Sequence, residues 1–249
     1  MRPCPPEITW RELDKRLFSR RDNGFHNFGD NLDRWLYWEL TGKFLPDRTY
    51  LMAGSVAKRS GDMIVWGSGF GSLTDKCGKP KKVCAVRGKL TRERYLRQGY
   101  DCPEVYGDPA LLLPRVFRPT ELPRATQRIG FVPHKRDNRI FPWAKLIHPE
   151  QNHPKEYVTK MLMCDMIASS SLHGLITADT YGIPNVWVGF EDRKRGLGSG
   201  YDYYKWLDYY SAIDLEYQPS PMTELEVQRR ATVHPTPDLN TLMSSCPFA

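Results

Sequence analysis

Short apolar runs typical of buried strands alternate with helix-forming segments along the first half of the chain. A helix is expected where apolar residues recur at helical spacing from Leu32 to Leu40, with Asp30 or Asn31 as its N-cap. Strands are expected at 50–53, 63–66 and 83–86, and a second helix at about 91–98. Helices that alternate with strands favour a parallel β-sheet, because parallel strands need crossover connections.

The same alternation resumes after residues 115–127, which are rich in proline and arginine and are typical of a linker. The pattern predicts an α/β protein with two parallel-sheet domains, residues 1–118 and residues 125–249. The segment after Pro235 either wraps back or frays. The expected strands of the second half lie at 129–132 and near 145–148, and its expected helices at 154–164, 201–213 and 224–231.

The most informative segment, residues 166–188, has the pattern of a strand, a serine-rich turn, a helix and a second strand. One of the three serines at 169–171 is expected to cap this helix, and Gly182 to end it. His173 then lies in the first helical turn, where backbone N–H groups and the helix dipole favour an anion. An imidazole at such a position suits acid catalysis on a phosphate-bearing substrate, and a helix-capping histidine is the structural alternative.

The composition is that of a globular protein with a moderately basic charge. Lys and Arg outnumber Asp and Glu by 36 to 29, and the net charge of +7 suits an anionic substrate, a nucleic acid or a membrane surface. The 6 cysteines lack paired or metal-site spacing, which favours a reducing compartment. The chain has no apolar signal core and no apolar run of ~18 residues. We therefore expect a cytoplasmic protein, and peripheral contact with the inner membrane face stays open.

Six short motifs follow one another along the chain: NFGDNL (27–32), VWGSGF (65–70), VRGKLT (86–91), VYGDPALLLP (105–114), GFVPH (130–134), and SSLHGLI with YGIP (170–184). With these motifs in this order, the chain resembles the polysaccharide pyruvyl transferases. The similarity is greatest to the branch that decorates bacterial exopolysaccharides, such as the xanthan and succinoglycan enzymes. The resemblance implies two Rossmann-like domains facing a cleft, as in a compact B-type glycosyltransferase, with the acceptor on the N-terminal side and the donor on the C-terminal side.

The resemblance also implies a reaction: transfer of pyruvate from phosphoenolpyruvate to two hydroxyls of one sugar, which forms a cyclic ketal and releases phosphate. The acceptor would be a sugar of an exopolysaccharide repeat unit, carried on a lipid. No cofactor or metal is expected, because no histidine or cysteine pair has metal-ligand spacing. We expect His173 to protonate the enol carbon, since an imidazole titrates near ~6.5. Arg87 is expected to grip the donor anion with its planar guanidinium.

The chain departs from the family at Ser171, where many members have an arginine before Leu-His. Another cation should then hold the donor carboxylate, and the candidates are His134, Lys135, Arg193 and Arg195. Further substrate-binding residues are expected at the donor phosphate, at the acceptor sugar and at other strand ends. They are, in that order, Ser170, Ser171 and Leu172; Asn27, Asp30 and Asn31; and Gly67, Ser68, Gly69 and Asp108.

Two other classes of protein were weighed against a pyruvyl transferase. A B-type glycosyltransferase that uses a nucleotide sugar would share the fold, and Glu191 or Asp192 could hold its ribose. A non-catalytic basic protein would need a continuous basic face, whereas these motifs cluster at strand ends, so no nucleic-acid partner is expected. The turn at 67–72 lacks G-x-G-x-x-G spacing, and neither a P-loop nor a G-x-S-x-G motif occurs.

Overall fold

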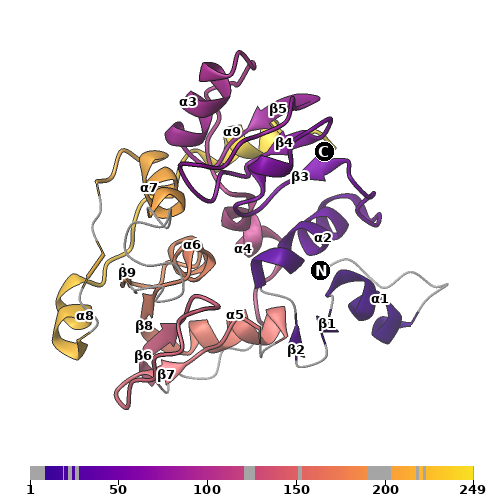
Figure 1. Cartoon of the computed structure of the whole chain (residues 1–249). Coiled ribbons are helices and arrows are strands. Elements are labelled where there is room, and N and C mark those ends of the chain that lie inside the picture. Colours follow the sequence, from indigo (N-terminus) through magenta and orange to yellow (C-terminus); the bar gives the residue numbers. More distant parts are fainter. Residues whose placement is uncertain are drawn as a thin grey trace. The chain divides into compact units, whose positions relative to one another are not determined.

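Two parallel β-sheets form the framework of the chain (Figure 1). Every neighbouring strand pair in both sheets is parallel, which confirms the predicted α/β class. The computed structural model describes residues 9–18, 20–21, 24–25, 28–120, 127–150, 153–189, 203–216, 219–220 and 223–248. One sheet has the order β3-β4-β5, with strands Tyr50–Leu51, Ile64–Trp66 and Lys82–Ala85. The other has the order β7-β6-β8-β9, with strands Lys145–Leu146, Gln127–Val132, Cys164–Ser169 and Asn185–Trp187.

Each sheet lies in its own compact unit, and each unit is assembled from three stretches of the chain. Unit 1, around the four-stranded sheet, contains residues 1–44, 112–190 and 219–234. Unit 2, around the three-stranded sheet, contains residues 45–111, 191–218 and 235–249. The predicted domains were contiguous halves of the chain, and their assignment to an acceptor and a donor side stays a prediction.

The helices of unit 1 bury the apolar faces that the sequence predicts. Figure 1 shows α5, α6 and α8 around the four-stranded sheet. Trp35 and Leu36 of α2 are fully buried. However, α2 begins at Phe28, so the prediction that Asp30 or Asn31 is its N-cap is wrong. The described helices of this unit are α1 (Trp10–Leu17), α2 (Phe28–Thr41), α4 (Leu113–Val116), α5 (Pro154–Leu162), α6 (Leu172–Thr180) and α8 (Glu224–Arg230).

Helix α1 and the antiparallel pair β1 (Arg20–Arg21) and β2 (Gly24–Phe25) were not predicted. A capping box starts α1: the Glu12 N–H donates to Thr9 Oγ1 at 3.2 Å, and the Thr9 N–H donates to Glu12 Oε2 at 2.9 Å. This reciprocal pair satisfies two N–H groups that the helix leaves without partners. The T-x-x-E pattern in the sequence was therefore the signal for α1.

Unit 2 is completed by the end of the chain. The Trp66 Nε1–H lies 3.0 Å from the Leu242 carbonyl oxygen and 3.1 Å from Ser245 Oγ, so the segment after Pro235 wraps back onto β4. No helix within the described ranges of either unit is long and apolar enough to cross a bilayer. The described helices of unit 2 are η1 (Ala57–Arg59), α3 (Lys89–Arg97), η2 (Pro109–Leu112, which ends at the unit's border), α7 (Tyr204–Ser211) and α9 (Leu239–Ser244).

Candidate active site

The strand order of unit 1 reverses beside β6. From β6 the chain passes to β7 on one side and then to β8 on the other. Val132 at the end of β6 pairs with Ser169 at the end of β8, so the loops after these strands start side by side. Ligands of open parallel sheets bind at the carboxyl ends of the strands where the strand order reverses. The topology therefore indicates a ligand site at the loops after β6 and β8, which carry four predicted site residues: His134, Lys135, Ser170 and Ser171.

Ser170 joins the two loops. Its hydroxyl donates to Asp137 Oδ2 at 2.6 Å and accepts the backbone N–H of His134 at 2.9 Å. The His134 side chain is 7% exposed, whereas Lys135 is exposed on the same turn. The structure thus brings Ser170 and His134 together, and the Ser170 hydroxyl is engaged within the protein. Their roles in binding a substrate stay predictions.

Helix α6 starts without a capping hydrogen bond from a serine side chain. Ser171 is its N-cap residue, and the Ser171 side chain forms no capping hydrogen bond. Ser169 Oγ accepts the Ser171 N–H at 3.0 Å and lies 2.9 Å from the Val132 carbonyl oxygen. The expectation that one of the three serines caps this helix is therefore wrong, because the hydroxyls of Ser169 and Ser170 fix the turn instead. The Leu172 side chain is buried, which leaves only its backbone for the binding role predicted for it.

The first turn of α2 packs against His173. A Cβ built on Gly29 would lie 2.3 Å from both Cε1 and Nδ1 of the imidazole, so only a glycine permits this approach. Asn31 is 1% exposed, and the side chain of Asp30 lies outside the described part of the structure, as does Asn27. The motif at 27–32 and the motif at 170–176 therefore meet within one unit, at the half-buried ring of the predicted acid.

An ion pair that sequence reasoning missed lies on the same edge of the sheet. Asp137 accepts from Arg139 Nε at 2.8 Å and from Arg139 Nη2 at 2.6 Å, which is the fork geometry of a strong carboxylate–guanidinium pair. Arg139 Nη2 also donates to the Gly189 carbonyl oxygen, which follows β9, at 3.0 Å. The signal in the sequence was an Asp and an Arg two residues apart, in the loop that follows the predicted strand at 129–132.

Arg87 lies at the end of β5 in unit 2, fully buried. Its Nε and Nη2 lie 2.9 Å and 2.8 Å from Asp208 Oδ2 of α7, and its Nη1 donates to Ser55 Oγ at 2.7 Å. Nη2 also donates to the Phe70 carbonyl oxygen at 2.6 Å. The guanidinium is therefore engaged with partners inside unit 2, and its role as a donor clamp stays a prediction.

The same carboxylate caps α3. The Thr91 N–H and the Thr91 hydroxyl each donate to Asp208, to Oδ1 and Oδ2, at 2.7 Å. The Lys89 N–H donates to Ser211 Oγ at 2.9 Å, which satisfies another N–H of the first turn. A helix N-terminus favours negative charge, and here the charge comes from α7 of the same unit. Asp208 thus neutralises Arg87 and completes α3 at once.

The remaining predicted residues of unit 2 have structural contacts. Asp108 Oδ2 accepts the Gly54 N–H at 2.9 Å, and Asp108 Oδ1 accepts the Ala110 N–H at 3.0 Å. A Cβ on Gly69 would lie 2.5 Å from the Arg87 guanidinium carbon, so this glycine makes room for the buried pair. Gly67 has a φ of +86°, and Ser68 is fully buried. The binding roles predicted for these four residues, Gly67, Ser68, Gly69 and Asp108, remain untested.

Comparison with known proteins decides the family to which these motifs belong. The model of the family described as "Polysaccharide pyruvyl transferase" matches residues 5–192, well over half of the chain. The chain belongs to the polysaccharide pyruvyl transferase family. All three segments that meet at the carboxyl edge of the unit 1 sheet, at 28–31, 132–139 and 169–173, lie inside the matched range.

Two curated proteins are similar to this member of the family. An uncharacterized protein of Acanthamoeba polyphaga mimivirus is 29% identical over 181 residues, which cover 67% of this chain and 61% of that protein. "Succinoglycan biosynthesis protein ExoV" of Rhizobium meliloti (strain 1021) is 28% identical over 214 residues, which cover 78% of this chain and 63% of that protein. The chain thus spans about three fifths of the length of these relatives. No solved structure matches it.

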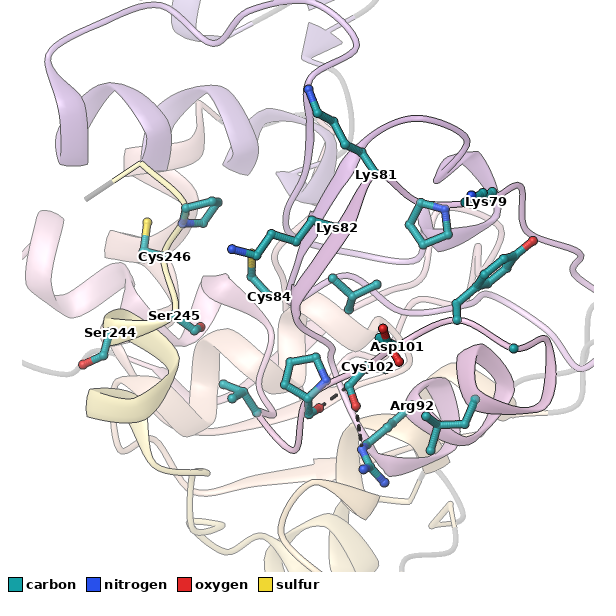
Figure 2. A pocket seen from close by; sticks show the side chains of 18 residues that line it. Lys79, Lys81, Lys82, Cys84, Arg92, Asp101, Cys102, Ser244, Ser245 and Cys246 are labelled. Atoms are coloured by element: carbon teal, nitrogen blue, oxygen red, sulfur yellow. Dashed lines mark hydrogen bonds between the residues drawn. The ribbon is translucent and has the colours of Figure 1, made fainter.

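A separate hollow of about 1120 Å³ on unit 2 contains none of the predicted site residues (Figure 2). Lys79, Lys81 and Lys82 line it, together with Arg92. Burial raises the pKa of its Cys102 thiol to about 12, which keeps that thiol neutral and poorly nucleophilic. The hollow is thus a basic surface depression with no described catalytic group.

Several predicted residues fall outside the described part of the structure: Arg193 and Arg195, together with Glu191 and Asp192 of the alternative hypothesis. Within the described ranges, no group of three or more His, Cys, Asp or Glu side chains is arranged to hold a metal ion. The described candidate site of this pyruvyl transferase family member is therefore the carboxyl edge of the four-stranded sheet.

Proposed function

We propose that the chain transfers pyruvate from phosphoenolpyruvate to two hydroxyls of one sugar in an exopolysaccharide repeat unit, forming a cyclic ketal. The observation that carries this proposal is the start of α6, where Ser171 makes no capping bond and His173 follows at the reversal of strand order. Membership of the polysaccharide pyruvyl transferase family and similarity to a succinoglycan biosynthesis protein support the reaction class. The acceptor would be a lipid-linked oligosaccharide.

In this proposal the donor phosphate lies at the N-terminus of α6. The backbone N–H groups of the first turn and the Ser171 hydroxyl are neutral donors, and the helix dipole adds attraction for the phosphate. A phosphate next to His173 would favour the protonated imidazole, because an opposite charge nearby stabilises the charged form. His173 would then be ready to act as a general acid.

The proton balance of the reaction fits one acid in this position. His173 gives a proton to the methylene carbon of the enol, which becomes a methyl group, while a first sugar hydroxyl adds to the neighbouring carbon. The second hydroxyl displaces the phosphate from that carbon. Two hydroxyl protons are released in all: one restores His173 and the other leaves with the phosphate. The positioned acid would supply roughly 10²–10⁴-fold of the rate.

The two parallel-sheet units support a finer proposal about the fold. We infer that each unit is a Rossmann-like domain of an arrangement related to the B-type glycosyltransferases. Unit 1 would be the donor-binding unit, because its strand order reverses between the two loops of the candidate site. We also propose a cytoplasmic location, where phosphoenolpyruvate is available, with no metal or organic cofactor.

A thermal-shift experiment with purified protein tests the donor. Phosphoenolpyruvate at about 100 times its Kd should stabilise the folded state by about 2.7 kcal/mol. UDP-glucose and GDP-mannose, as representative nucleotide sugars, should leave the melting temperature unchanged. Phosphate release in the presence of a lipid-linked oligosaccharide acceptor would then establish the transfer. Stabilisation by a nucleotide sugar and not by phosphoenolpyruvate would replace this proposal with a glycosyltransferase.

A further inference from the structure

We propose that Arg139, oriented by Asp137, is the subsite that binds the carboxylate of the donor. This inference rests on the proposed function, since it assigns one end of the phosphoenolpyruvate molecule to a residue of the same site. None of the candidates considered from the sequence was Arg139.

Asp137 is built into the protein before any ligand arrives. Its side chain is 2% exposed and accepts three side-chain donors: Ser170 Oγ at 2.6 Å, Arg139 Nε at 2.8 Å and Arg139 Nη2 at 2.6 Å. A buried carboxylate with hydrogen bonds of this kind is held in one place, because leaving it unpaired would be costly. Asp137 therefore fixes the plane of the Arg139 guanidinium.

The cationic end of this pair faces outward. The Arg139 side chain is 36% exposed, whereas its carboxylate partner is almost completely covered. Nη2 also donates to the Gly189 carbonyl oxygen, so the guanidinium reaches from the loop after β6 to the end of β9. Nη1 makes no hydrogen bond to any residue in the described ranges. The edge of the guanidinium that includes Nη1 is therefore the part that can bind an anion.

Arg139 is placed close to the predicted phosphate site. Asp137 Oδ2 is shared by Arg139 Nη2 and the Ser170 hydroxyl, and Ser170 directly precedes the N-cap residue of α6. A small donor molecule whose phosphate lies at the α6 N-terminus would have its carboxylate close to the Asp137–Arg139 pair. Two separate anion sites on one edge of a sheet suit a substrate that carries both a phosphate and a carboxylate.

A fixed guanidinium binds carboxylate or phosphate, and the phosphate of the donor is assigned to the α6 N-terminus, which leaves the carboxylate for Arg139. Nε and Nη2 of Arg139 are engaged with Asp137 and Gly189, so the donor carboxylate would bind the N–H groups of Nη1 in the plane that Asp137 fixes. An ammonium such as that of Lys135 acts instead as a mobile point charge. Arg87 and Arg139 are both paired with a carboxylate, but the Arg87 side chain is fully buried with Asp208, whereas the Arg139 side chain is 36% exposed. Arg139 is thus the oriented guanidinium that unit 1 offers at its carboxyl edge.

Two ligands and three variants test the subsite by titration calorimetry. Phosphoenolpyruvate carries both anions, and ethyl phosphate is a phosphate monoester without a carboxylate. Arg139→Gln should weaken phosphoenolpyruvate binding about 10- to 100-fold, the loss expected for a charge-assisted hydrogen bond. Ethyl phosphate binding should change by less than about 3-fold, because only long-range attraction is lost. Arg139→Lys should give an intermediate loss for phosphoenolpyruvate. Arg128→Gln is the matched control, since it removes the same charge from the exposed start of β6.

The outcomes separate this inference from the proposed function. Equal weakening of both ligands, or unchanged phosphoenolpyruvate binding in Arg139→Gln, would overturn the carboxylate subsite. Failure of the wild-type protein to bind phosphoenolpyruvate would instead overturn the proposed function itself. If Arg139→Gln unfolds because Asp137 loses its partner, the double variant Asp137→Asn/Arg139→Gln restores a neutral pair. Selective loss of phosphoenolpyruvate binding in the folded double variant supports the subsite, and retained binding overturns it.

Discussion

Helices α3 and α6 both start directly after a strand of a parallel sheet, yet their N-termini are completed in different ways. At α3 the Asp208 carboxylate and the Ser211 hydroxyl accept N–H groups of the first turn, and Asp208 also neutralises Arg87. At α6 the N-cap residue Ser171 makes no side-chain bond. The difference indicates that the anion site at the α3 N-terminus is occupied by Asp208 of the protein itself, whereas the N-terminus of α6 is suited to an anionic ligand.

The sheets around these helices differ in the same sense. Strands β3, β4 and β5 lie in sequence order, so the described strands of unit 2 contain no reversal. In unit 1 the reversal falls between β6 and β8, directly beside α6. Because ligand sites in such sheets form where the order reverses, topology and helix capping favour the same location.

The largest effect is expected at the internally filled helix. Asp208→Ala would leave Arg87 buried without its carboxylate and would remove a cap from α3. We expect the free energy of unfolding of the protein to fall by about 3–5 kcal/mol, as for other broken buried ion pairs. Urea unfolding would measure this change. Asp214→Ala is the control, because that carboxylate is 80% exposed and its pair with Lys89 should be worth less than about 1 kcal/mol.

The next effect is expected at the predicted acid. His173→Ala should lower turnover at least ~10²-fold, the usual scale for a general acid, and leave the melting temperature nearly unchanged. Single-turnover kinetics with phosphoenolpyruvate and a sugar acceptor would measure the loss. A fully active variant would reduce His173 to a structural residue and would remove the functional half of the comparison between α3 and α6.

Arg87→Lys distinguishes a structural role of Arg87, as the partner of Asp208, from a role in binding the donor anion. If α7 fills the α3 site permanently, this change should lower the free energy of unfolding and leave donor affinity unchanged, because the planar fork serves Asp208. The donor-clamp role predicted from the sequence requires instead that phosphoenolpyruvate binding weakens by about 1.5–3 kcal/mol. Calorimetric titration of the folded variant with phosphoenolpyruvate decides between the two roles. Weaker binding of phosphoenolpyruvate would show that Arg87 also contacts the donor and does not serve Asp208 of α7 alone.

Gly29→Ala probes the contact between the two motifs of unit 1. A methyl group 2.3 Å from the imidazole must displace either the ring or the helix, which should destabilise the protein by about 1–3 kcal/mol and lower turnover. The double variant Gly29→Ala/His173→Ala should recover most of that stability, because the obstructing ring is gone. Gly61→Ala is a suitable control, since the nearest atom to its added Cβ is 4.0 Å away. Absence of recovery in the double variant would refute the contact.

The smallest effect is expected at Ser171. Ser171→Ala removes one neutral hydroxyl from the predicted phosphate site, so donor affinity should fall by roughly 0.5–1.5 kcal/mol while turnover persists. Direct titration with phosphoenolpyruvate would detect this change. Complete loss of turnover with the fold intact would contradict a binding role and indicate that the hydroxyl takes part in catalysis.

The local elements of the fold could be predicted because each depends on a short pattern. Apolar runs located the strands β3 to β6, and helical spacing with Gly182 located α6. Helix α1 was missed although its T-x-x-E signal is present and its apolar residues Trp10, Leu13 and Leu17 recur at helical spacing. Boundaries differed by a few residues, as at α5, which ends at Leu162 before β8 begins at Cys164.

The partners of the site residues could not be predicted because they depend on tertiary contacts. His134, Ser170 and Ser171 were expected at strand ends, and the structure places them on adjacent loops. The sequence carries no local sign that Asp208 would meet Arg87, because nothing in the spacing of two residues so far apart encodes a contact. For the same reason Gly29 could not be linked to His173 before the structure of unit 1 was known.

The large sequence separation between Arg87 and Asp208 has a consequence for folding during translation. These partners are 121 residues apart, and Trp66 and its partner Leu242 are 176 apart. During translation, domains generally fold as units beginning at the N-terminus. Both units depend on later stretches of the chain, and in unit 2 the strands β3 to β5 are synthesised long before the residues that complete the unit. We therefore expect Arg87 and Trp66 of the nascent sheet to stay exposed until their partners have been synthesised. Hydrophobic surface that is exposed during synthesis favours aggregation, so the order of synthesis makes the completion of unit 2 a late and vulnerable step of folding.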